Sequence, residues 1–143
     1  MHANLREIAE AATVDPKQAL LDAVGELSYY EVFHNLVLIA TYVASEKVGS
    51  LYMPDQTLTA GRFYNEVGLV LKSGPLAFRD DDAVKFGGIT IATGDWVLYK
   101  PSEAWEHFIR DRRGAHKGVS VRLVHDTRVL ARVVDPTMIG RSR

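Results

Sequence analysis

The chain has 143 residues, a formal net charge of −1 and no cysteine, and 47% of its residues are hydrophobic and 24% charged. This length suits a single domain, and the composition is that of a globular protein rather than a disordered one. The lack of cysteine excludes disulfides and thiolate metal sites, and the near-neutral charge argues against a general nucleic-acid or membrane-surface binder.

The sequence shows no sign of a membrane segment or a secretory signal. No apolar run approaches the roughly 18 residues of a membrane-spanning helix, and the N-terminus lacks the basic-then-apolar pattern of a signal peptide. We therefore expect a soluble, intracellular protein with no membrane partner.

Residues 1–28 form an N-terminal arm whose clearest feature is a short helix. Asp15 is the expected N-cap, Pro16 occupies the first helical position, and Gln18 would complete a capping box. An apolar stripe follows, and Gly25 can end the helix. So short a helix is marginal by itself, so the arm must dock on something to be ordered.

From residue 29 onward, β-branched and apolar runs separated by glycine turns predict an all-β domain that spans 29–143, a small barrel or sandwich. Gly68, inside an expected strand, suggests a bulge or a close backbone approach. The strands are expected at 32–43 (one, or two joined by a bend), 63–74, 89–91, 96–99, 119–124 and 129–134. The expected loops are an exposed loop at 43–57, a hairpin loop at 74–88 and an insert-like loop at 101–117. The core is expected to include Val37, Ile39, Val70, Val97 and Val121.

No motif for catalysis stands out. None of the five histidines sits in a metal-ligand pair, and the chain lacks a nucleophile elbow, a P-loop and a dinucleotide-binding glycine motif. The pair His125-Asp126 is expected in a turn, and the acidic run 80–82 lacks the ligand spacing of a calcium loop. The basic run 110–117 could contact phosphate, but such a run is more often solvated or pairs subunits. We expect no enzyme activity, no cofactor and no metal.

The most unusual stretch is an apolar triplet inside a polar, turn-rich segment. Leu51, Tyr52 and Met53 follow Gly49-Ser50 and precede a proline and an aspartate. An apolar triplet gains nothing from burial in such a loop unless something else covers it. The triplet is either an ordinary edge strand folded onto its own domain or a contact for a partner.

The order of the pieces resembles the GroES-like chaperonin cofactors, whose fold is a small irregular β-barrel. The resemblance covers residues 33–135 and rests on sequence fragments that are each short. They are FHNLVLIA at 33–40 for the opening strand, GSLYMPD at 49–55 for the end of a mobile loop, Gly68 and Gly74 six residues apart, TGDWVLY at 93–99, and VSVRLVHDTRVLARVV at 119–134 for the terminal hairpin.

The resemblance implies a role for the triplet. In that family, the mobile loop becomes ordered when its apolar triplet enters a groove on the large chaperonin ring. The implied partner-binding residues are Gly49, Ser50, Leu51, Tyr52, Met53 and Pro54.

The chain also departs from the family pattern. Gly49-Ser50 replaces a Gly-Gly pair, the arm 1–28 precedes the first strand, the 101–117 segment looks like an insert, and a basic tail ends the chain. These departures make the chain look most similar to divergent members from tailed phages, because long arms suit a protein tied to neighbours in an assembly.

Two functions therefore stay open. The first is a structural virion protein that decorates or cements a phage capsid through its arms and its exposed loop and binds capsid protein neighbours. The alternative is a phage or bacterial co-chaperonin in the host cytoplasm, a ring-shaped lid that binds a GroEL-type chaperonin through residues 49–55. A homo-oligomer is expected in either case, and a nucleic-acid partner is the least favoured.

Overall fold

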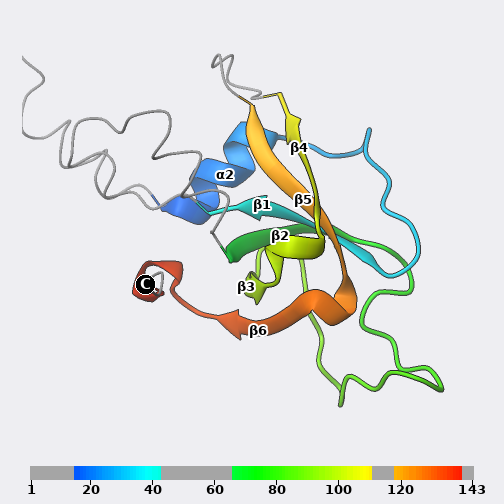
Figure 1. The fold of residues 1–143 in the computed structure, drawn as a ribbon. Helices are drawn as coiled ribbons and strands as arrows, with labels where there is room; N and C mark the ends of the chain where they lie inside the picture. Colours follow the sequence, from blue (N-terminus) through cyan, green and yellow to red (C-terminus); the bar gives the residue numbers. More distant parts are fainter. Residues whose placement is uncertain (1–14, 43–65, 111–117, 140–143) are drawn as a thin grey trace, which may run out of the picture.

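The computed structural model describes residues 15–42, 66–110 and 118–139 (Figure 1). Within them, one helix, α2 (Pro16–Val24), accompanies a six-stranded antiparallel sheet with the order β4-β5-β1-β2-β3-β6. The strands are β1 (Leu36–Thr41), β2 (Val67–Ser73), β3 (Trp96–Tyr99), β4 (Trp105–Ile109), β5 (Val119–His125) and β6 (Val129–Val133). Short 3-10 turns occupy Pro101–Glu103, Asp126–Arg128 and Pro136–Met138. The expected predominance of β-structure is confirmed.

Helix α2 begins and ends where its local signals predict. The Asp15 side chain accepts a hydrogen bond from the Lys17 backbone N–H, and Pro16 is the first helical residue. Gly25 ends the helix with a φ of 72° and donates its N–H to the Leu21 carbonyl. The predicted capping box is wrong, because the Gln18 side chain donates to Asp22 one turn further along.

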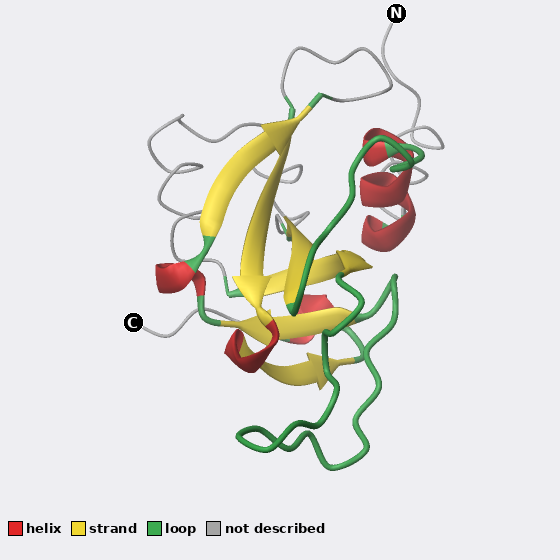
Figure 2. Cartoon of the chain, turned by 90° about the vertical axis from the view of Figure 1, so that its right-hand side faces the viewer, coloured by secondary structure: helices red, strands yellow, loops and turns green. Residues whose placement is uncertain are grey.

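One face of the sheet packs against α2. Alternation along the strands directs Leu38, Ala40 and Leu69 to this face, where they form a cluster with Ala23 and Val24 of the helix. The Lys72 ammonium group donates to the backbone carbonyls of Leu27 and Tyr30, in the connection between α2 and β1. The same connection runs across the front of the molecule in Figure 2. The arm is therefore held on its own sheet by apolar packing and by the hydrogen bonds of the half-buried Lys72 side chain.

The opposite face holds a second core. Its fully buried members are Val37, Ile39, Val70, Val97, Tyr99 and Val124. Together with Val121 on the first face, these include all five core residues predicted from the sequence, each of them 0% exposed.

Gly68 shows the close backbone approach that its position in β2 predicts. A Cβ atom at this position would lie 2.2 Å from Ile39 Cγ2 and 3.2 Å from Tyr99 Cε1. The missing side chain therefore leaves room chiefly for the Ile39 side chain and the Ala40 carbonyl of β1. The irregularity in the β1–β2 register falls elsewhere, between Leu38 and Ile39.

The sheet is strongly rolled. Strands β5 and β6 take the second position and the far edge of the sheet, yet only the turn Asp126–Arg128 joins them. Three extended residues span about 10 Å, so the end of β5 and the start of β6 must lie close together. The sheet is nevertheless not closed, because β4 pairs with β5 and β6 pairs with β3 and neither is paired with the other.

A buried carboxylate stabilises this turn. Asp126 is 3% exposed; its two carboxylate oxygens accept hydrogen bonds from the Asn35 side chain and from the Phe78 backbone N–H, each at 3.0 Å. The Asp126 N–H donates in turn to the Asn35 carbonyl. The predicted turn at His125-Asp126 is confirmed, and it ties the segment before β1 and the segment after β2 to the β5–β6 connection.

Three of the sequence expectations for strands and loops are wrong. Residues 89–91 do not form a strand. The chain reaches β2 only after them, where the Gly94 N–H donates to the Val70 carbonyl and the Val70 N–H donates to the Asp95 carbonyl. The 101–117 segment is not only a loop, since it contains strand β4, which pairs with β5. The strand expected within 32–43 begins only at Leu36, because His34 has a φ of 55° and forms a turn.

Within the described part of the chain, none of the helical segments has the length and apolar character needed to cross a bilayer.

Candidate functional site

The predicted partner-binding residues 49–54 lie outside the described residues, so the structure gives no geometry for them. It does show where their segment joins the sheet. Strand β1 ends at Thr41, β2 begins at Val67, and the Tyr42 N–H donates to the Val67 carbonyl at 3.0 Å. The two ends of the 43–65 segment therefore attach side by side at one end of the rolled sheet.

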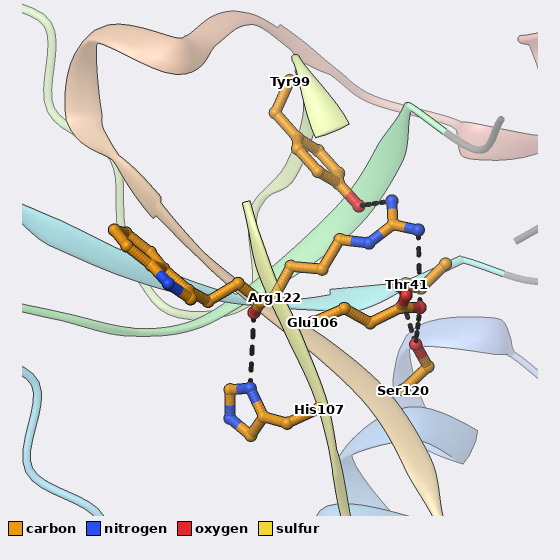
Figure 3. A network of polar contacts seen from close by, with 7 residues as sticks. Thr41, Tyr99, Glu106, His107, Ser120 and Arg122 are labelled. Carbon is orange, nitrogen blue, oxygen red and sulfur yellow. Dashed lines mark hydrogen bonds and ion pairs between the residues drawn. The ribbon is translucent and has the colours of Figure 1, made fainter. Parts of the chain in front are cut away.

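A network of polar side chains lies at this end of the sheet, on the face that holds the second core (Figure 3). At its centre is the Arg122 side chain of β5, which is 3% exposed. Its Nη1 donates to the Tyr99 hydroxyl at 2.9 Å, and its Nη2 lies 3.5 Å from Glu106 Oε2. Because Tyr99 is on β3 and Glu106 on β4, a single guanidinium group links three strands that are not all neighbours in the sheet.

Two hydroxyl groups complete the network. Ser120 donates to Glu106 Oε2 at 3.1 Å, and its oxygen lies 3.4 Å from the hydroxyl oxygen of Thr41. Burial raises the pKa of Tyr99, and the positive charge of Arg122 partly opposes this shift. The Tyr99 phenol is therefore held in its neutral form at neutral pH, where it accepts a hydrogen bond from the guanidinium group.

The contacts in this network are those of a structural link between strands, not those of a general acid–base catalytic site. Ser120 lies beside a carboxylate that already binds Arg122, and none of the imidazoles in the described part of the chain is directed toward its hydroxyl group. The imidazole of His107, the next residue along β4, is directed to the other face of the sheet. There its Nε2 lies 2.8 Å from the Tyr30 hydroxyl and its Nδ1 lies 3.3 Å from the Trp105 carbonyl oxygen.

The other described histidines and the acidic run do not come together as a catalytic or metal centre. The His125 side chain contacts Asn35 and Trp105, and the ring of His34 lies against Phe33. Asp80 and Asp81 accept hydrogen bonds from backbone N–H groups of their own exposed loop. Residues 15–42, 66–110 and 118–139 contain no group of three or more histidines and carboxylates that could hold a metal ion.

A set of exposed apolar side chains forms the strongest candidate for a functional surface. It lies on β6 and on the 3-10 turn that follows, with β6 below the other strands in Figure 1 and the turn to its left. We call this set the C-terminal apolar segment. Its members are Leu130 (58% exposed), Val134 (96%), Met138 (76%) and Ile139 (40%).

The conformation of this segment is set by polar contacts, not by burial of its apolar groups. The Asp135 carboxylate accepts hydrogen bonds from the Thr137 N–H at 3.0 Å and from the Thr137 hydroxyl at 2.6 Å, and these bonds lower the pKa of Asp135. Pro136 is buried. The turn therefore directs Val134 and Met138 into solvent, where neither gains from burial within the chain.

The sequence analysis did not single out this segment. Its signal was present, since two apolar residues, Met138 and Ile139, follow a helix-capping Asp-Pro-Thr turn after the last strand. The pattern of burial on β6 also differs from a simple alternation, because the register between β3 and β6 shifts between Leu98 and Tyr99.

Comparison with known proteins adds no family. No family model matches the chain, and a search of curated proteins finds no match.

Proposed function

We propose that this protein is a non-enzymatic structural protein that binds neighbouring protein subunits in an assembly. The observation that carries the proposal is the C-terminal apolar segment. Val134 and Met138 are 96% and 76% exposed although their backbone is ordered by its own turn. Burying two such side chains on a partner stabilises a complex by about 1.5–3 kcal/mol each before ordering costs.

The finer proposal is a GroES-like barrel that decorates or cements the capsid of a tailed phage and is located in the virion. It is supported by the resemblance of residues 33–135 to GroES-like proteins and by the rolled, antiparallel sheet. An exposed segment beyond the last strand is an addition that suits contact with capsid protein neighbours. The network around Arg122 supports the non-enzymatic part of the proposal, because its polar groups bond to one another.

The second candidate is a co-chaperonin, a homo-oligomeric ring that binds a GroEL-type chaperonin through residues 49–55. One observation favours it: the segment that contains Leu51, Tyr52 and Met53 joins adjacent, paired strands of the sheet, as a loop that leaves and re-enters at one place does. For this candidate, the proposed partner-binding residues of the chain are Gly49, Ser50, Leu51, Tyr52, Met53 and Pro54.

Native mass spectrometry, with and without a GroEL-type chaperonin, separates the two candidates. For the structural protein we expect no stable complex with the chaperonin, and we expect many copies of the chain in purified phage particles. A ring that binds the chaperonin, together with particles that lack the chain, would replace the first candidate by the second.

A further inference from the structure

The two outer strands of the sheet, β4 and β6, are each paired on one side only within the described part of the chain. Each strand has five residues, and three of the five are exposed in each. An open strand edge with apolar side chains is a template for pairing with a further strand. The chemistry of the two edges indicates which strand would cover them.

The directions of the strands allow the two edges to pair with each other. Neighbouring strands are antiparallel throughout the order β4-β5-β1-β2-β3-β6, so β4 and β6 run in opposite directions. When β6 of one copy lies beside β4 of a second copy, the contact is again antiparallel, and the sheet continues from one copy into the next.

The two edges of one chain do not make this contact. An ion pair between Glu103 and Arg128 joins the segments just before β4 and β6, and Ala104 and Val129 pack on the same core. The two strands therefore start close together. In an antiparallel pair, the start of one strand lies beside the end of the other. The β4 edge thus needs the β6 edge of another molecule.

Pairing over the full length sets side chains of compatible chemistry opposite each other. Glu106 and Arg132 carry opposite charges, and their side chains are 42% and 49% exposed although each already holds one ion pair within its own chain. Phe108 and Leu130 are 57% and 58% exposed. The opposite residues are Trp105 with Val133, Glu106 with Arg132, His107 with Ala131, Phe108 with Leu130, and Ile109 with Val129.

This register also keeps the two faces of the sheet continuous. Glu106 lies opposite Arg122 in β5, and Arg132 lies opposite Val97 in β3, so both side chains are on the face of the second core. A shift by one residue would set the side chains of one face against those of the other.

Pairing of an edge with the same edge of a second copy lacks this match. Full overlap of two β4 strands sets Glu106 opposite Phe108, and full overlap of two β6 strands sets Leu130 opposite Arg132. Each arrangement places charged side chains opposite apolar ones, whereas opposite charges across two strands stabilise a pair. The β4 edge therefore matches the β6 edge of a second copy best.

We propose that the chain associates with itself by antiparallel pairing of β6 of one copy with β4 of the next, with Glu106 opposite Arg132. Because the two edges differ, the contact is head to tail, and its repetition gives a ring or a filament. The inference deepens the proposed function and rests on it, since it names a second copy of the chain as one of the neighbouring subunits. Its test uses the purified chain alone, whereas the role of Val134 and Met138 is decided by binding to particles.

Disulfide cross-linking tests the register, because the chain has no cysteine of its own. His107 and Ala131 are opposite in the proposed contact, where Cβ atoms lie about 4.5–5.5 Å apart, close enough for a disulfide after a small shift. When the His107→Cys and Ala131→Cys proteins are mixed and oxidised, we expect the main product to join one copy of each variant in intact mass spectrometry. A mixture of His107→Cys with Asp82→Cys, at an exposed residue outside both edges, should give little product.

Sedimentation velocity measures the association without cysteines. We expect oligomers of the unsubstituted chain. Arg132→Glu sets two carboxylates opposite each other and should raise the Kd by about fivefold or more. Arg79→Glu, the same change of charge at an exposed residue outside both edges, should leave association unchanged. Melting temperatures near that of the unsubstituted chain show that the variants fold.

Three results would each overturn the proposal. The first is an unsubstituted chain that sediments as a monomer. The second is a mixture of the His107→Cys and Ala131→Cys proteins that yields no more joined product than either protein alone. The third is an Arg132→Glu protein that associates as tightly as the unsubstituted chain.

Discussion

Two buried charged side chains, Arg122 and Asp126, link strands and loops that are far apart in the sequence. Arg122 links Tyr99 of β3 to Glu106 of β4, and Asp126 links the β5–β6 turn to two loops. A buried charge that loses its partner is costly, so substitutions at these residues affect stability much more than substitutions of exposed ionisable residues do.

The first prediction concerns the carboxylate of Asp126. The Asp126→Ala substitution should destabilise the fold by about 2–4 kcal/mol, because it leaves the Asn35 amide and the Phe78 N–H without their acceptor. Asp82→Ala, at an exposed residue, is the matched control and should change the free energy of unfolding by less than about 0.5 kcal/mol. Equal stability of the two variants in urea denaturation would show that the Asp126 contacts are unimportant.

The second prediction concerns the pH dependence that Tyr99 confers. Burial raises its pKa above the value of 10.0 for a free tyrosine. A group whose pKa is higher in the folded state stabilises that state fully below its unfolded-state pKa, and this contribution is lost as pH rises through the folded-state pKa. Tyr99→Phe should therefore be less stable than the unsubstituted protein at neutral pH, because Arg122 loses its acceptor.

The difference in stability between these two proteins should shrink as pH rises above about 10. Urea denaturation at a series of alkaline pH values measures it. A difference that stays constant or grows above this pH would contradict the assignment of a raised pKa to Tyr99.

The core valines and isoleucine could be predicted from the sequence, whereas Arg122 could not. Strand β1 is a continuous apolar run, which marks Val37 and Ile39 as core, and the alternation of apolar residues along β5 marks Val121. The alternation along β5 assigns Arg122 to the solvent side. It is buried because the sheet rolls and covers both faces, and the rolling depends on contacts far apart in the sequence.

At the scale of the elements, local signals predict α2 well and β4 poorly. Asp15, Pro16 and Gly25 act within a few residues of one another, so the limits of the helix follow from the sequence alone. Strand β4 has the sequence WEHFI, with two ionisable residues, and it is a strand because it pairs with β5 along its length. Residues 89–91 have the composition of a strand but gain no pairing partner.

The third prediction concerns the docking of α2 on the sheet. Val24 and Val134 are a matched pair, since they are 1% and 96% exposed. Val24→Ala should destabilise the protein by about 1–3 kcal/mol through a cavity between the helix and the sheet, whereas Val134→Ala should have an effect below about 0.5 kcal/mol. Thermal denaturation that gives both variants the same melting temperature would show that α2 does not contribute to the core.

At the scale of the whole molecule, the sheet order and the exposed surfaces determine what the protein can bind. Neither follows from the sequence pattern. The position of β6 at the far edge, next to β3, arises from the short Asp126–Arg128 turn in a rolled sheet. This position leaves the C-terminal apolar segment at the outside of the molecule, where we propose that it binds a protein partner.

The proposed role of the C-terminal apolar segment in partner binding is tested by the occupancy of phage particles by variants of this segment. Val134→Ser combined with Met138→Ser removes two of its exposed apolar side chains, and neither substitution touches the core. The matched variant replaces Leu51, Tyr52 and Met53 by serine. Quantitative mass spectrometry of particles assembled with each protein gives the number of copies bound per particle, and the melting temperatures establish that both variants fold.

We expect the Val134→Ser/Met138→Ser protein to keep its melting temperature and to lose particle binding by about tenfold or more, since two side chains that the complex would bury are lost at about 1.5–3 kcal/mol each. We expect the variant at residues 51–53 still to bind particles. Full occupancy by the Val134→Ser/Met138→Ser protein would contradict the proposed role of the C-terminal apolar segment.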